Sequence, residues 1–80
     1  MINYSKTFSD TVWDNIIETD ATYMLQVKKG TVFVMASDTI PTSSNGAFEL
    51  DAGSVLHSNL LLGNIWVRST DGTGLVAYAK

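Results

Sequence analysis

The chain of 80 residues has no cysteine, one proline and one histidine, and these scarcities exclude several classes of protein. Without cysteine, neither a disulfide framework nor a thiolate metal site can form. The single histidine, His57, has no second ligand at a recognised spacing, so we expect it to have no metal-binding or catalytic role. A G-x-S-x-G motif is also absent. The sequence therefore predicts a protein that is not an enzyme and uses no metal or cofactor.

Charged residues are scarce as well, at 16% of the chain, and the formal net charge is -3. The five basic residues are scattered, which argues against nucleic acid as a partner. Asp10, Asp14, Glu18 and Asp20 form a loose acidic stretch without a calcium-loop glycine, so we expect them to be solvated. No segment approaches the roughly 18 apolar residues of a membrane span, and no signal-peptide core follows the start. We expect no membrane insertion and a cytosol-like place of synthesis.

What the sequence does contain is short apolar runs separated by turn residues. Such a pattern predicts an all-β fold, a small antiparallel β-sandwich or barrel of about six to eight short strands. We assign residues 12–80 to a single β-sandwich domain and residues 1–11 to an N-terminal arm or edge segment. Residues 11–19 also fit one face of a helix, but their β-branched content favours a strand. The segments "AFEL" and "SVLH", on either side of Ala52-Gly53, are predicted as two further short strands.

Two hairpins are predicted from glycine-containing turns. Lys29-Gly30 would join two alternating runs, with Val27 facing Val32 on an apolar side. The other side would hold Met24 against Met35 and Gln26 against Phe33. Asp71-Gly72 would close a second hairpin, and the pairs that this register predicts are Val67 with Val76 and Ile65 with Tyr78. Its opposite side would hold Trp66, Arg68, Leu75 and Ala77. The sequence therefore predicts positive φ at Gly30 and Gly72.

These hairpins leave apolar side chains on the side away from the core. A domain of this size buries only roughly 60% of its unfolded surface and here has no disulfide support. We therefore predict a symmetric homo-oligomer, with a trimer favoured, in which the exposed side chains lie between subunits. The predicted interface residues are Met24, Phe33, Met35, Trp66 and Arg68.

An ordered set of short motifs spans residues 12–79: Trp13 and Ile16, then "YMLQV", "GTVFV", "SDTIP", "GAFEL", "AGSVL", "IWVRS" and "GTGLVAY". This order resembles short bacteriophage virion proteins built as small β-sandwiches. The matching residues are Gly30, Val32, Val34, Ser37, Pro41, Gly46, Leu50, Trp66, Val67 and Arg68, whereas residues 1–9 depart from the pattern. The resemblance implies a non-enzymatic structural role in a virion, as a head decoration, head-tail or tail accessory protein. The protein would be made in the host bacterial cytoplasm, often be a homotrimer, and contact other virion proteins.

The alternative is a host-receptor or carbohydrate-binding module. Trp13, Trp66 or Tyr78 would then provide an aromatic platform for a host surface glycan. Glycan binding by the isolated protein would favour this alternative, and stoichiometric recovery in purified particles would favour the virion role.

Overall fold

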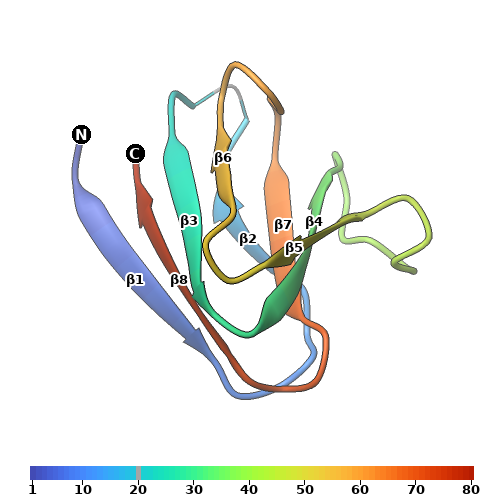
Figure 1. Cartoon of the computed structure of the whole chain (residues 1–80). Helices are drawn as coiled ribbons and strands as arrows, with labels where there is room; N and C mark the ends of the chain where they lie inside the picture. Colours follow the sequence, from blue (N-terminus) through green and yellow to red (C-terminus); the bar gives the residue numbers. More distant parts are fainter. Residues whose placement is uncertain (20) are drawn as a thin grey trace.

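The computed structural model describes residues 1–19 and 21–80, and all regular elements in these residues are β-strands. Asp20, one member of the acidic stretch, lies outside the described residues. The strands of the described part of the chain are β1 (Asn3–Phe8), β2 (Asp14–Ile17), β3 (Met24–Lys29), β4 (Thr31–Ala36), β5 (Phe48–Asp51), β6 (Val55–His57), β7 (Ile65–Ser69) and β8 (Gly74–Ala79). Within those residues they form two four-stranded antiparallel sheets, which confirms the predicted small β-sandwich (Figure 1).

The strand order defines the topology. The first sheet has the order β1-β8-β3-β6, and the second sheet has the order β2-β7-β4-β5. Thus β1 pairs with β8, β2 with β7, β3 with β6 and β4 with β5, so the first half of the chain runs antiparallel to the second half. These four strand pairs form one long antiparallel ribbon. The ribbon folds over on itself, so that β3 also pairs with β8 and β4 also pairs with β7. This arrangement of eight strands is a jelly roll.

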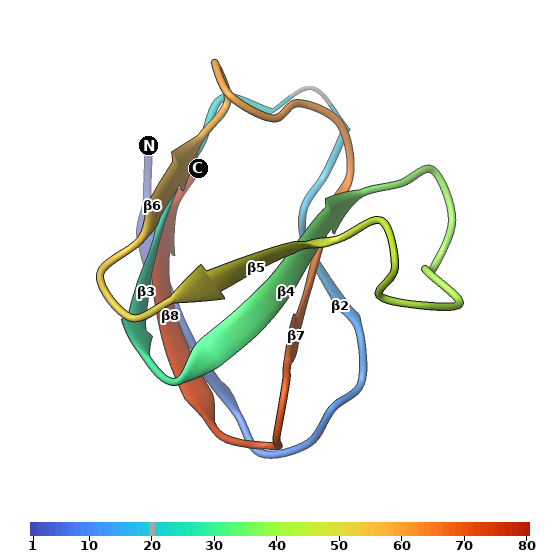
Figure 2. The same ribbon diagram turned by 45° about the vertical axis from the view of Figure 1, so that its right-hand side comes forward.

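The two predicted hairpins are wrong as pairings, although their turns are placed correctly. Gly30 and Gly72 have φ values of 73° and 91°, as predicted. However, each turn carries the chain from one sheet to the other, because β3 and β8 belong to the first sheet and β4 and β7 to the second. Figure 2 shows these crossings at one end of the sandwich, while the β4–β5 loop extends away from it. We call the crossings at Lys29-Gly30 and at residues 70–73 the two corners.

The core lies between the two sheets and is made of the residues that alternate inward. Leu25, Val27, Val32, Val34, Ile65, Val67 and Val76 are fully buried. Tyr23, Ile17 and Phe8 fill the ends of this layer and are also buried. The predicted inward faces are therefore correct, because a strand that crosses to the facing sheet still points the same alternate residues at the core.

The two N-terminal segments both form strands of the sandwich. Residues 14–17 form a strand, not a helix, and pair with β7. Residues 3–8, which the sequence set apart as an arm or edge segment, form β1 at the edge of the first sheet. Phe8 of this strand lies in the core, and Ile2 exchanges both backbone hydrogen bonds with Lys80.

Candidate interaction site

The outer face of the second sheet collects most of the predicted interface residues. Phe33 lies beside Arg68 and Met35 lies beside Trp66, because β4 and β7 are neighbours in this sheet. All four side chains are half-buried. The indole Nε1 of Trp66 donates to the carbonyl of Ser37 at 2.9 Å, which fixes the ring at the end of β4. We call this surface, made of Trp13, Phe33, Met35, Trp66 and Arg68, the arginine face.

Arg68 is held between two aromatic rings. Its Cζ lies 4.7 Å from the ring centre of Phe33 and 5.6 Å from that of Trp13. These distances are typical of cation–π contacts, which are favourable when the guanidinium is partly desolvated. The sequence predicted only that Arg68 shares a face with Trp66, whereas the rings that flank Arg68 are Phe33 of β4 and Trp13 in the segment before β2. Only the sheet order, in which β7 lies between β2 and β4, brings them together.

Among the described residues, most donors of the Arg68 guanidinium have no hydrogen-bond partner. Its Nη1 donates to the backbone carbonyl of Ser69 at 3.0 Å. In residues 1–19 and 21–80 the ion pairs are Lys6 with Asp14 and Lys80 with Glu18, so Arg68 has no carboxylate partner there. An arginine that is oriented by two rings and lacks an ion pair can receive an anionic group from a ligand or partner.

Met24 does not belong to the arginine face, and its predicted pairing with Met35 is wrong. Met24 lies beside Ala79 and His57, on the outer face of the first sheet. That face carries a shallow groove of about 220 Å³ lined by Met24, Gln26, Ala77, Ala79 and residues of β1 and β8. Likewise, Gln26 does not face Phe33, and Leu75 and Ala77 do not share a face with Trp66 and Arg68. The predicted interface residues are thus divided between opposite sides of the molecule.

Buried polar contacts in the second corner have a structural role. Ser69 is fully buried, and its Oγ donates to the carbonyl of Thr73 at 2.6 Å and accepts from the amide of Gly72 at 3.0 Å. Hydrogen bonds from the hydroxyl and amide of Thr73 hold the pKa of Asp71 below its usual value. Ser69 was not singled out from the sequence, because the sequence does not distinguish a serine that is hydrogen-bonded to the backbone of a buried turn from an exposed serine.

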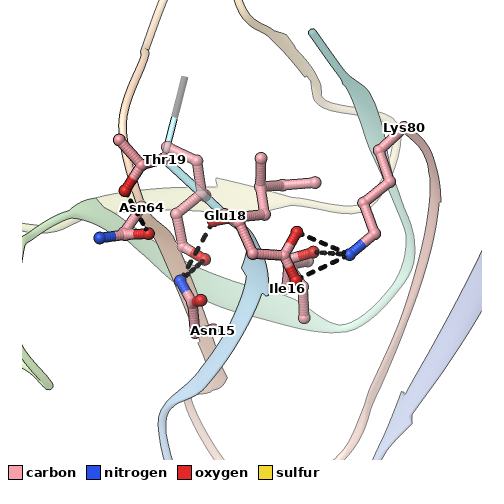
Figure 3. Close-up of polar contacts among 8 residues, drawn as sticks. Asn15, Ile16, Glu18, Thr19, Asn64 and Lys80 are labelled. Atoms are coloured by element: carbon pink, nitrogen blue, oxygen red, sulfur yellow. Dashed lines mark hydrogen bonds and ion pairs between the residues drawn. The ribbon is translucent and has the colours of Figure 1, made fainter. Parts of the chain in front are cut away.

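A second polar cluster ties the C-terminal residue to β2 (Figure 3). Lys80 Nζ lies 3.0 Å from Glu18 Oε2 and donates to the carbonyl of Ile16 at 3.2 Å. The hydrogen bond from Lys80 lowers the pKa of Glu18, and the same contact raises the pKa of Lys80. Nearby, the side chain of Asn15 donates to the carbonyls of Ile17 and Ile65. These contacts fasten β2 to the rest of the sandwich.

In the described part of the chain, no group of three His, Cys, Asp or Glu side chains is placed to hold a metal ion. His57 lies on β6, where it pairs with Met24. No helix among the described residues has the length and apolar character needed to cross a membrane. The arginine face, the outer face of the first sheet and the sheet edges are the described surfaces that offer non-covalent contacts.

Comparisons of the chain with protein-family models, with curated proteins and with solved structures find no match. The fold is that of a small jelly-roll β-sandwich, and its function must be inferred from its surfaces and its sequence motifs.

Proposed function

We propose that this protein is a non-enzymatic structural protein of a bacteriophage virion, a head decoration, head-tail or tail accessory subunit that acts through protein–protein contacts. The observation that carries the proposal is the jelly-roll strand order in a chain of only 80 residues. Jelly rolls occur in virus capsid proteins, in lectins and in cupins, so a role in a virion is among those that this fold has. The motif order from Trp13 to Tyr78 adds the resemblance to virion proteins.

The surface composition supports a role in assembly. Met24, Val55 and Phe48 are about half exposed on strands, and Leu60 and Leu62 are exposed in the loop before β7. So many large apolar side chains on a small domain are typical of a protein that contacts others in its working state. Self-association and contact with other virion proteins are parts of this proposal.

Quantitative mass spectrometry of gradient-purified particles tests the proposal, with the phage whose genome encodes this chain. We expect a fixed copy number per particle that survives repeated purification. Recovery only in the soluble lysate, with none in the particles, would overturn it.

A second candidate function, binding of a host surface glycan, is favoured by the arginine face. Arg68 offers free donors between Trp13 and Phe33, and a sugar that bears a carboxylate would suit both the charge and the rings. A glycan array probed with the purified protein should then show binding to acidic glycans that is lost in Arg68→Gln. The matched control Lys28→Gln removes the same charge from the opposite sheet and should leave binding intact.

A further inference from the structure

The structure has four edge strands among the described residues, and three of them are protected against pairing with another chain. β6 has three residues, too few for an extended ladder. β5 carries two exposed carboxylates, Glu49 and Asp51. β2 is irregular between Asn15 and Ile17, and Lys80 occupies the carbonyl of Ile16. Shortness, charge and bulges are the usual devices that prevent edge-to-edge association.

The remaining edge strand, β1, has none of these protections on its outer side. It has six residues, without proline or a bulge, and it lies at the margin of the first sheet in Figure 1. Its outward side chains, those of Asn3, Ser5 and Thr7, are exposed and uncharged. The one charge on the strand, Lys6, is paired with Asp14 at 3.2 Å.

The hydrogen-bonding direction of β1 follows from its register with β8. Ile2 and Lys80 exchange both backbone hydrogen bonds, at 2.8 and 3.1 Å. In an antiparallel ladder these doubly bonded pairs alternate with unbonded ones, so the even-numbered residues of β1 bond to β8. The amides and carbonyls of Asn3, Ser5 and Thr7 therefore point away from the sheet.

We propose that β1 pairs with β1 of a second copy of this chain, antiparallel and centred on Ser5, so that the first sheets of the two copies form one continuous sheet. This proposal deepens the proposed function, because it names the contact through which the chain associates with itself. An antiparallel strand pair of identical sequence has two-fold symmetry and closes on two copies. The expected species is thus a dimer, in place of the trimer favoured from the sequence.

The choice of centre follows from the side chains that would face each other. With Ser5 at the centre, Asn3 lies opposite Thr7, and all three outward-pointing residues take part in hydrogen bonds. On the inner side, the exposed Ile2 lies opposite Phe8, and the half-exposed ring of Tyr4 lies opposite Lys6. A shift by one step toward the C-terminus would place Lys6 opposite Lys6, which like-charge repulsion disfavours.

A cysteine placed at the two-fold axis tests the pairing, since the described residues contain no other thiol. Directly opposed residues of a hydrogen-bonded pair have Cα atoms about 5.5 Å apart, within the range that a disulfide spans. Ser5→Cys should therefore form a covalent dimer under mild oxidation. Thr7→Cys is the matched control, because its two copies would lie about 14 Å apart along the strands, beyond disulfide reach. The double variant Asn3→Cys/Thr7→Cys should cross-link again.

Light scattering on the cysteine-free protein provides the second readout. We expect twice the chain mass of 8.7 kDa at micromolar concentration. Ser5→Pro should return the mass to that of one chain while the circular dichroism spectrum is retained, because the Ser5 amide is not used within the chain and proline is tolerated at such edge positions. A monomeric or trimeric wild type, or equal cross-linking of Ser5→Cys and Thr7→Cys, would overturn the edge pairing. Recovery in phage particles is a separate measurement, so the proposed function can stand when the pairing fails.

Discussion

Replacement of Gly30 by alanine tests the contact between the two corners. The φ of 73° at Gly30 lies in the left-handed region that favours glycine. A Cβ on Gly30 would lie 2.9 Å from the carbonyl oxygen of Thr73 and 3.3 Å from Cα of Gly74. Both are backbone atoms, one at the end of the second corner and one in the first residue of β8, so they cannot rotate away as a flexible side chain would. Gly30→Ala therefore combines backbone strain with a clash.

Alanine variants at two other glycines separate the cost of backbone strain from the cost of the clash. Gly53 has a φ of 96° and no atom within 4 Å of its Cβ position, so Gly53→Ala reports strain alone. We expect that strain to cost about 1–2 kcal/mol. Gly46 has no positive φ, and its Cβ would meet only the end of Met35 at 3.5 Å. Gly46→Ala should be neutral or stabilising by about 0.4–1 kcal/mol, through the lower entropy of the unfolded chain.

The clash at Gly30 adds the cost of displacing packed backbone, which for overpacked sites is about 1–3 kcal/mol. The expected total for Gly30→Ala is about 2–5 kcal/mol, the sum of strain and clash. A domain of this length has a free energy of unfolding of about 4–12 kcal/mol, so the loss is a large fraction of it.

Urea unfolding followed by the fluorescence of the two tryptophans measures the three variants on one scale. The predicted order of stability is Gly46→Ala, then Gly53→Ala, then Gly30→Ala. Equal losses at positions 30 and 53 would refute the contact between the corners. A neutral Gly30→Ala would refute the left-handed backbone at that corner as well.

Two further predictions concern the polar contacts. Ser69→Ala should lower the free energy of unfolding by about 1–3 kcal/mol, because it removes the buried partner of the Thr73 carbonyl and the Gly72 amide; a loss near zero in urea unfolding would contradict this. Glu18→Gln should cost about 0.2–1 kcal/mol at pH 7, as is usual for partly exposed ion pairs. Because the folded-state pKa of Glu18 is lowered, its contribution is present above its ordinary pKa and disappears as the pH falls through the folded value. The wild type and Glu18→Gln should therefore have the same stability at low pH, and a difference that persists there would show that Lys80 does not act through the carboxylate.

Much of the fold was predictable because burial leaves a direct trace in the sequence. Inward residues alternate with outward ones in β3, β4, β7 and β8, and the period of two fixes which side chains enter the core. Glycine at 30 and 72 marked the ends of strands through its conformational freedom. The all-β class, the short strands β5 and β6 and the strand character of residues 14–17 followed from the same signals.

The sheet partners were not predictable in this way, because a hairpin and a corner have the same alternation. In a hairpin, Val27 and Val32 point to the same side of one sheet. In the jelly roll they lie on facing sheets and still point into the same core. For the same reason the predicted interface was wrong in part. It placed Met24 on one face with Phe33 and Met35, whereas Met24 lies on the first sheet and the other two lie on the second sheet. Trp13 was missed as a neighbour of Arg68 because their proximity depends on the pairing of β2 with β7.

The glycine at the first corner explains why a hairpin signal occurs where there is no hairpin. Gly30 is required for its positive φ and also for its close approach to the carbonyl of Thr73. Gly74 has no positive φ, yet a Cβ there would lie 3.5 Å from the carbonyl of Lys29, so it contributes to the same approach from the opposite side. The two corners therefore pack against each other, and the glycines at 30 and 74 serve a contact between segments far apart in the chain. The sequence shows that a residue is glycine, but not whether a positive φ or the close approach of another backbone segment requires it. A glycine-containing turn therefore predicts that the chain reverses direction, and it does not predict which strands pair with the two strands that it joins.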